Sequence, residues 1–253
     1  VVTGVAAGST TITYTVTDGN GCTSTATTTV TINAIPVVAA ISGTTEVCAG
    51  STTTLTSATA NGVWTSSNTS VATVNSSTGV VTGVAAGTTT ITYTVTTNNC
   101  TSSAQATVNV NALPTLAAIG GTNSACVGST TILTNTTSGG VWTSDDATVA
   151  TVNSITGEVT GVDAGTATIT YTYTNSNGCT SAVTETVTIN ALPTVASITG
   201  TTTLCVGATE TLANATAGGT WSTANTATAT INSSGVVTGV AAGSTTITYT
   251  VTD

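Results

Sequence analysis

An internal repeat constrains the fold of this chain more than any other feature of its sequence. The segment GVAAG begins at Gly4, Gly83 and Gly239, and its variant GVDAG begins at Gly161, so the spacings are 79, 78 and 78 residues. The opening segment Val1–Asp18 recurs unchanged as Val236–Asp253. A period of this length is too long for one coil of a solenoid and favours a string of small domains. The pattern predicts three periods plus an overlap, taken from a longer array.

Short apolar segments that end in proline separate the repeats, at Asn33–Pro36, Asn111–Pro114 and Asn190–Pro193. Proline fixes its own φ and restricts the residue before it, and no Gly/Ser spacer adjoins these segments, so we expect stiff joints and a head-to-tail rod. The predicted parts are the C-terminal part of a repeat at 1–36, complete repeats at 37–114 and 115–193, and the N-terminal part of a repeat at 194–253.

The residues within each repeat predict an all-β fold. Threonine alternates with Ile12, Tyr14 and Val16, which places these three side chains on one face of a strand. No stretch shows the 3.6-residue apolar period of a helix, and about seven short strands per repeat favour a β-sandwich. We expect the following residues in the core between two sheets: Trp64, Trp142, Trp221, Tyr14, Tyr93, Tyr171, Tyr249, Leu55 and Leu212.

The charge of the chain excludes several functional classes. It contains no Lys, Arg or His, and nine carboxylates give a net charge of −9. Such a surface cannot neutralise phosphates, which argues against nucleic acid and against anionic lipid as partners. No apolar run approaches the roughly 20 residues of a membrane-spanning helix, so we expect no membrane insertion. Without His or Lys the usual proton carriers are absent, and the scattered acids differ between repeats, so we predict no enzyme.

Two other binding chemistries deserve comparison with simpler interpretations. The loop that begins at Asp18 and the pair Asp145–Asp146 have oxygen ligands suited to calcium. However, Thr97 replaces Asp18 in the next repeat, so a plain hairpin turn is preferred and neither a metal nor a cofactor is assigned. The tryptophans could stack on sugars, but one Trp at one fixed strand position per repeat is more typical of a sandwich core.

The repeats resemble a known domain family. The segment after Thr201 reads TTLCVGATETLANATAGGTWSTANTATATINSSGVVTGVAAGSTTITYTVTD. It is similar to the bacterial immunoglobulin-like group 2 domain, and the likeness extends over every repeat. The cysteine pattern resembles versions in giant surface proteins of Bacteroidota, among them gliding-motility adhesins exported by type IX secretion. The resemblance implies tandem immunoglobulin-like β-sandwiches, display on the bacterial cell surface and a role in adhesion.

The resemblance also bears on cysteine pairing. Each repeat has one cysteine before a Val-Gly or Ala-Gly turn and one at a hairpin: Cys48, Cys126 and Cys205, and Cys22, Cys100 and Cys179. In an immunoglobulin sandwich these two places lie at opposite poles, about 30 Å apart along a strand of ten residues. Head-to-tail stacking instead brings the turn of one repeat to the hairpin of the next, which favours Cys48–Cys179 and leaves the partners of Cys22, Cys100, Cys126 and Cys205 outside the segment. Bonds within a repeat, Cys48–Cys100 and Cys126–Cys179, and free thiols remain alternatives.

The sequence therefore favours a structural role outside the cell. The leading hypothesis is a stalk or spacer of a repetitive surface adhesin or filament, with neighbouring repeats of the same chain as its partners. A second hypothesis is multivalent binding to surface polysaccharide or to other cell-surface proteins. A third is a self-assembling extracellular filament subunit. Disulfides require an oxidising compartment, which agrees with an extracellular location.

Overall fold

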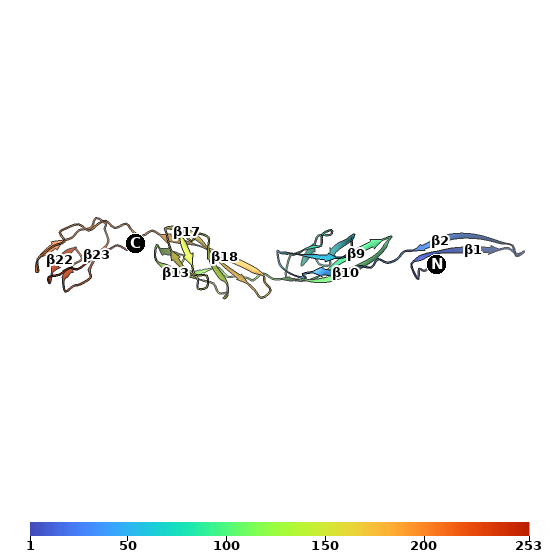
Figure 1. The fold of residues 1–253 in the computed structure, drawn as a ribbon, viewed down its shortest axis with the longest axis horizontal. Coiled ribbons are helices and arrows are strands. Elements are labelled where there is room, and N and C mark those ends of the chain that lie inside the picture. Colours follow the sequence, from blue (N-terminus) through green and yellow to red (C-terminus); the bar gives the residue numbers. More distant parts are fainter. Residues whose placement is uncertain (253) are drawn as a thin grey trace. The chain divides into compact units, whose positions relative to one another are not determined.

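The computed structural model describes residues 1–252, which contain 23 strands and no helix. The predicted all-β sandwich fold is confirmed. The chain divides into two compact units, residues 1–116 with 172–182 and residues 117–171 with 183–253. In Figure 1 the paired strands β9 and β10 lie side by side.

The first sandwich follows the end of the first proline segment. One sheet has the order β4-β10-β9-β6 and the other β3-β5-β8-β7. All neighbours are antiparallel except β4 and β10, which run parallel. The strands are β3 (Ile41–Gly43), β4 (Glu46–Cys48), β5 (Thr52–Ser57), β6 (Gly62–Ser66), β7 (Ala72–Val74), β8 (Val80–Gly83), β9 (Gly87–Thr97) and β10 (Cys100–Asn111).

The second sandwich repeats this topology. Its sheets have the orders β12-β18-β17-β14 and β11-β13-β16-β15, and β12 runs parallel to β18. The strands are β11 (Gly120–Gly121), β12 (Ser124–Cys126), β13 (Thr130–Thr134), β14 (Val141–Ser144), β15 (Ala150–Val152), β16 (Glu158–Gly161), β17 (Gly165–Thr174) and β18 (Thr180–Asn190).

The segments before and after the two sandwiches form smaller sheets. A long antiparallel hairpin consists of β1 (Gly8–Thr17) and β2 (Thr23–Ile32). At the other end of the chain, one sheet has the order β19-β22-β21 and the other pairs β20 with β23. These strands are β19 (Thr209–Thr211), β20 (Thr220–Thr223), β21 (Ala229–Ile231), β22 (Val236–Gly239) and β23 (Ile247–Thr250).

The core of each sandwich lies between the two sheets and follows from the alternation along the strands. In β9 the apolar residues Ile91, Tyr93 and Val95 are buried, while the threonines between them face outward. Burial of such side chains contributes about 1.5–3 kcal/mol each. The first core also contains Val47, Leu55, Trp64, Ala72, Val81, Val108 and Val110, and its equivalents in the second sandwich include Leu133, Trp142, Ile169, Tyr171, Val187 and Ile189.

A tryptophan–tyrosine pair occurs in both complete sandwiches and again in residues 194–252. The ring centroids lie 4.5 Å apart for Trp64 and Tyr93, and 4.5 and 4.7 Å apart in the next two copies. The Tyr93 hydroxyl donates to the Thr59 carbonyl oxygen at 2.7 Å and accepts from the Gly62 amide at 2.8 Å. The buried phenol is therefore satisfied as both donor and acceptor, which fixes the ring and the turn before β6.

Three of the residues expected in the core are less buried than predicted. Tyr14 is 71% exposed, because β1 and β2 form a two-stranded sheet and no tryptophan-bearing strand pairs with β1 within residues 1–252. Trp221 and Tyr249 are half-buried, since the sheet that holds them has two strands in place of four. Leu55, Trp64, Tyr93, Trp142, Tyr171 and Leu212 are buried.

One buried polar position differs between the two complete sandwiches. In the first, the hydroxyl of Thr89, a buried side chain, lies 3.2 Å from that of Ser66 and 3.1 Å from that of Ser67. In the second, Ala167 stands at the place of Thr89, and the buried hydroxyl of Ser144 has no hydrogen-bond partner. An unsatisfied buried hydroxyl costs free energy, so this difference weakens the second sandwich.

We expect the substitution Ala167→Thr to raise the stability of the second sandwich by about 1 kcal/mol, because the new hydroxyl supplies a partner for Ser144. Hydrogen exchange at β14 and β17 would report the local free energy of opening. The reverse change in the first sandwich, Thr89→Ala, should lower protection there. Faster exchange in Ala167→Thr would contradict this explanation.

Glycine is required at the first residue of β6 for a steric reason. A Cβ atom at Gly62 would lie 2.3 Å from Cζ of Tyr93 and 2.6 Å from both of its Cε atoms. We expect Gly62→Ala to destabilise the first sandwich by about 2–4 kcal/mol, since the ring must move and its two hydrogen bonds weaken. Thermal unfolding would measure the loss, with Gly19→Ala, where a Cβ meets no atom within 4 Å, as the control.

Candidate functional site

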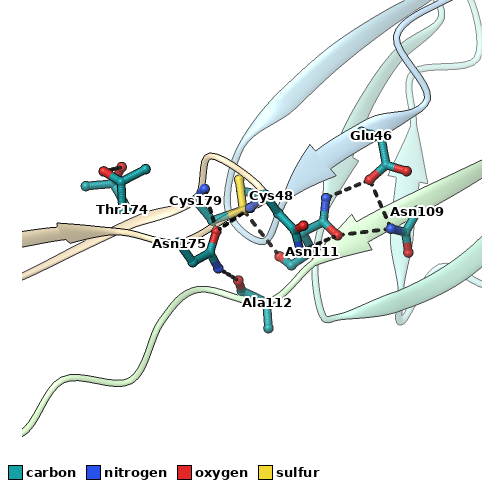
Figure 2. Close-up of a disulfide and its surroundings, with 10 residues drawn as sticks. Glu46, Cys48, Asn109, Asn111, Ala112, Thr174, Asn175 and Cys179 are labelled. Carbon is teal, nitrogen blue, oxygen red and sulfur yellow. Dashed lines mark hydrogen bonds between the residues drawn. A yellow bond between two sulfur atoms is a disulfide. The ribbon is translucent and has the colours of Figure 1, made fainter. Parts of the chain in front are cut away.

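The strongest candidate site is the contact that joins the first repeat to the hairpin of the second. Cys48, at the end of β4, forms a disulfide with Cys179, which lies just before β18. Their Cα atoms are 5.6 Å apart, inside the usual range for a disulfide. Figure 2 shows the bond between the turn after β4 and the hairpin that connects β17 and β18. Both residues belong to the same compact unit.

A tight turn presents the first cysteine. The Ser51 amide donates to the Cys48 carbonyl oxygen at 3.0 Å, and Gly50 has a φ of 81°. Glycine suits this place because the third residue of such a turn needs a positive φ. The same turn recurs at Cys126 with Gly128 and at Cys205 with Gly207. The Val-Gly or Ala-Gly sequence after each cysteine therefore explains the local structure of all three turns.

The hairpin that carries Cys179 has a side-chain cap. Oδ1 of Asn175 accepts from the amides of Asn177 and Cys179, both at 3.0 Å. In the first hairpin Oδ1 of Asp18 accepts from the amides of Asn20 and Cys22 at 2.9 Å. A neutral amide thus performs the same role as the carboxylate, which favours the turn interpretation of the Asp18 loop. No group of three potential metal ligands occurs within residues 1–252.

The hairpin at Cys100 has a different sequence and a shorter loop. Asn98 and Asn99 connect β9 and β10, and both have a positive φ, 48° and 63°. Asparagine tolerates this conformation in two-residue hairpins of type I′. Despite the different turn, Cys100 keeps the place of Cys179: its Sγ lies 3.7 Å from the Asn33 carbonyl oxygen, and Sγ of Cys179 lies 3.9 Å from that of Asn111.

Asparagine side chains hold the two sides of the disulfide together (Figure 2). Nδ2 of Asn175 donates to the Ala112 carbonyl oxygen at 3.1 Å, and Nδ2 of Asn177 donates to Oδ1 of Asn111 at 3.3 Å. The Ala49 amide donates to the Asn111 carbonyl oxygen at 2.9 Å. Asn111 therefore contacts both the turn of its own repeat and the hairpin of the next one.

Glu46 completes this network. Its Oε2 accepts from Nδ2 of Asn111 at 2.7 Å and from Nδ2 of Asn109 at 2.9 Å. These two hydrogen bonds, the one from Asn111 first, lower the pKa of the Glu46 carboxyl below its ordinary value. In its charged form the carboxylate can only accept, so it binds the Nδ2 side of Asn111 and leaves Oδ1 of Asn111 for Asn177.

The structure places the remaining predicted residues separately. Cys22, Cys100, Cys126 and Cys205 have free thiols among the described residues. The alternative pairs within a repeat, Cys48–Cys100 and Cys126–Cys179, are therefore not formed, because the turn and the hairpin of one sandwich lie at opposite ends of its long strands. Asp145 and Asp146 accept hydrogen bonds from Thr168 and Thr148. Residues 1–252 include no helix long and apolar enough to cross a membrane.

The asparagine network was not predicted from the sequence, although a signal for it exists. An asparagine stands at the start of each proline segment: Asn33 directly follows β2, and Asn111 and Asn190 are the last residues of β10 and β18. Nδ2 of Asn33 donates to the Asn98 carbonyl oxygen at 3.0 Å, so it also contacts the hairpin of the next repeat. The recurrence of this residue at a boundary indicates a contact role.

We expect the pKa of the Glu46 carboxyl to rise toward its ordinary value in the variant Asn111→Ala, because the first of its two donors is lost. The lowered pKa means that Glu46 stabilises the folded chain above its unfolded pKa and that this contribution disappears as pH falls through its folded pKa. Titration by carbon-detected NMR would follow the carboxyl signal. An unchanged pKa in Asn111→Ala and Asn109→Ala would contradict the role of these amides.

Comparison with known proteins gives a family and several distant structural matches. The family described as bacterial Ig-like domain (group 2) matches residues 26–108, 106–184 and 183–253. No curated protein sequence matches the chain. A SusE-like surface-located polysaccharide-binding protein of Bacteroides thetaiotaomicron has a TM-score of 0.39 and 12% identity, over 72% of this chain and 43% of that chain.

Two adhesins are among the other solved structures that match. A Ca²⁺-stabilized adhesin with which an Antarctic bacterium binds ice has a TM-score of 0.35 and 13% identity, over 95% of this chain and 80% of that chain. A C-terminal fragment of intimin has a TM-score of 0.33 and 14% identity, over 65% of this chain and 67% of that chain. At these scores the likeness carries no information on function.

Proposed function

Since the chain belongs to the bacterial Ig-like domain (group 2) family, we propose that it is a mechanical spacer of a bacterial cell-surface adhesin. The disulfide between Cys48 and Cys179 carries this proposal. It joins the turn of one repeat to the hairpin of the next, so a covalent bond reinforces the contact between neighbouring repeats. The partners of each repeat in this role are the repeats before and after it.

The bond changes which residues bear a pulling force. Cys48 and Cys179 are separated by 131 positions in the sequence. Tension applied at the ends of the chain passes from Cys48 directly to Cys179 through the sulfur atoms. The residues between them, from β5 to β17, lie outside this path. The spacer can therefore transmit force while most strands of both complete sandwiches remain folded and unloaded.

Several further features support a spacer. Short segments that end in Pro36, Pro114 and Pro193 connect the repeats. We propose that the repeats have the predicted boundaries 1–36, 37–114, 115–193 and 194–253. The stiffness of proline segments favours a head-to-tail rod. The disulfide suits an extracellular location. The family consists of a non-catalytic kind of domain, and we propose no enzymatic role.

The narrower assignment rests on the cysteine pattern. We propose display by a member of the Bacteroidota, in a gliding-motility adhesin exported by type IX secretion, because the paired cysteines resemble those proteins. Multivalent binding to polysaccharide is the alternative. It is disfavoured by the burial of Trp64 and Trp142, which are 5% and 4% exposed and so present no ring face to a sugar. A glycan-binding assay on the whole chain would test this alternative.

Force spectroscopy would test the spacer. We expect the chain, pulled from its two ends, to gain up to roughly 450 Å of contour length when a reductant opens the disulfide, at about 3.3–3.6 Å for each released residue. The variant Cys48→Ser should show this longer contour without reductant. Cys126→Ser changes the equivalent turn cysteine, which is a free thiol, and should behave as the unmodified chain. Equal contour lengths with and without reductant would refute the proposal that the disulfide carries the force past the residues between Cys48 and Cys179.

A further inference from the structure

A polar pocket lies beside the disulfide, within the compact unit that holds both cysteines. It measures about 350 Å³, and Glu46, Cys48 and Asn111 line it from the first sandwich. Asn177 lines it from the hairpin of the next repeat, and the rest of its wall consists mainly of residues that carry hydroxyl groups. One of the two bonded cysteines therefore borders a space that can hold a small molecule.

The two bonded cysteines differ in their exposure. Cys179 is 1% exposed and does not line the pocket, whereas Cys48 is half-buried and lines it. Thiol–disulfide exchange requires a thiolate to reach one of the two sulfur atoms, so access decides which sulfur is attacked. The pocket therefore directs an incoming thiolate to Sγ of Cys48.

A carboxylate lies on the same face of the strand as Cys48. Glu46 and Cys48 are two residues apart in β4, so their side chains point to one face, about 6.4–6.8 Å apart along the strand. Val47, between them, is buried on the other face. The amides of Asn109 and Asn111 that donate to Glu46 are neutral, and the chain has no Lys, Arg or His to offset its charge. The pocket thus holds a negative charge close to Cys48.

We propose that this pocket is the entry site for small thiols that open the Cys48–Cys179 bond, and that it favours thiols with a cationic or uncharged substituent over anionic ones. The carboxylate of Glu46 repels an anionic thiol such as glutathione. A thiol that carries an ammonium group forms a thiolate with no net charge, so this repulsion is absent. The reaction needs no load on the chain and goes beyond the proposed spacer function.

The exchange has a defined order. The thiolate attacks Sγ of Cys48, a new sulfur–sulfur bond forms there, and the electron pair of the old bond passes to Sγ of Cys179. That sulfur takes a proton from water and can donate it weakly to the Asn111 carbonyl oxygen, 3.9 Å away. A second small thiol then displaces Cys48 from the mixed disulfide. The products are two protein thiols and one small-molecule disulfide.

The first test measures the rate of reduction by cysteamine, 2-mercaptoethanol and 2-mercaptoethanesulfonate, whose thiolates have net charges of zero, minus one and minus two. The whole chain and its variant Glu46→Gln are compared at low ionic strength, where charges are weakly screened. Each thiol is compared with itself, so its own pKa and nucleophilicity cancel. We expect Glu46→Gln to raise the rate about two- to five-fold with the sulfonate, less with 2-mercaptoethanol and hardly at all with cysteamine.

Glu185→Gln is the matched control. It also removes a carboxylate that accepts from an asparagine, Asn123, but Glu185 does not line the pocket, so all three rates should stay unchanged. Equal acceleration of the three thiols in Glu46→Gln would indicate a looser junction and would overturn the proposal. The proposal would also fail if Glu46→Gln changed no rate, or if Glu185→Gln gave the same graded effect.

The second test identifies the sulfur that is attacked. The whole chain is treated briefly with cysteamine and quenched in acid, its free thiols are alkylated with N-ethylmaleimide, and peptic peptides are analysed by mass spectrometry. We expect cysteamine on Cys48 and the alkyl group on Cys179; cysteamine mainly on Cys179 would overturn the proposal. Both tests are made without load, so their failure would leave the spacer function standing, and an unchanged contour length under force would leave these results standing.

Discussion

The parallel pairing of β4 with the end of β10 is the constraint on which the junction depends. Glu46 pairs with Asn109, Val47 with Val110 and Cys48 with Asn111, and both valines are buried. This short contact closes the first sandwich and at the same time places the turn cysteine beside the last residue of β10. Because the chain leaves the sandwich at that residue, the hairpin of the following repeat contacts Cys48 and Asn111 together. The core of one repeat and its bond to the next are thus set by the same three residue pairs.

The small core is specified by a few residues that must fit together. The Trp–Tyr pair supplies most of its aromatic volume, and the tyrosine hydroxyl also satisfies the backbone at the turn before β6. Gly62 leaves room for the ring, and Thr89 satisfies the serines at the other end of β6. Where one of these residues changes, as at Ala167, a hydroxyl is left without a partner. A small domain buries a low fraction of its surface, so each such loss is a large part of its free energy of unfolding.

Most of the fold could be predicted from the sequence, because alternation along the strands and glycine at the turns are local signals. The burial of Trp64 and Tyr93 follows from the same alternation. The exposure of Tyr14 could not be predicted that way, since it depends on which strands pair with β1 and not on its own neighbours in the sequence. The role of Asn111 was also missed: its contacts with Glu46 and Asn177 join residues more than 60 positions apart, and the recurrence of asparagine at each boundary does not show which residues it contacts.

The amide network at the junction determines how this contact responds to salt concentration. Asn111, Asn175 and Asn177 are neutral, and within residues 1–252 the only charged group that is hydrogen-bonded to this network is the carboxylate of Glu46, which contacts Asn111. Dissolved ions screen the attraction between exposed opposite charges, which decays over about 10 Å at 0.1 M salt. They have little effect on hydrogen bonds between amides or on a sulfur–sulfur bond. Contacts of this composition keep their strength from fresh water to brine, so the junction around the disulfide does not depend on the ionic strength of its surroundings.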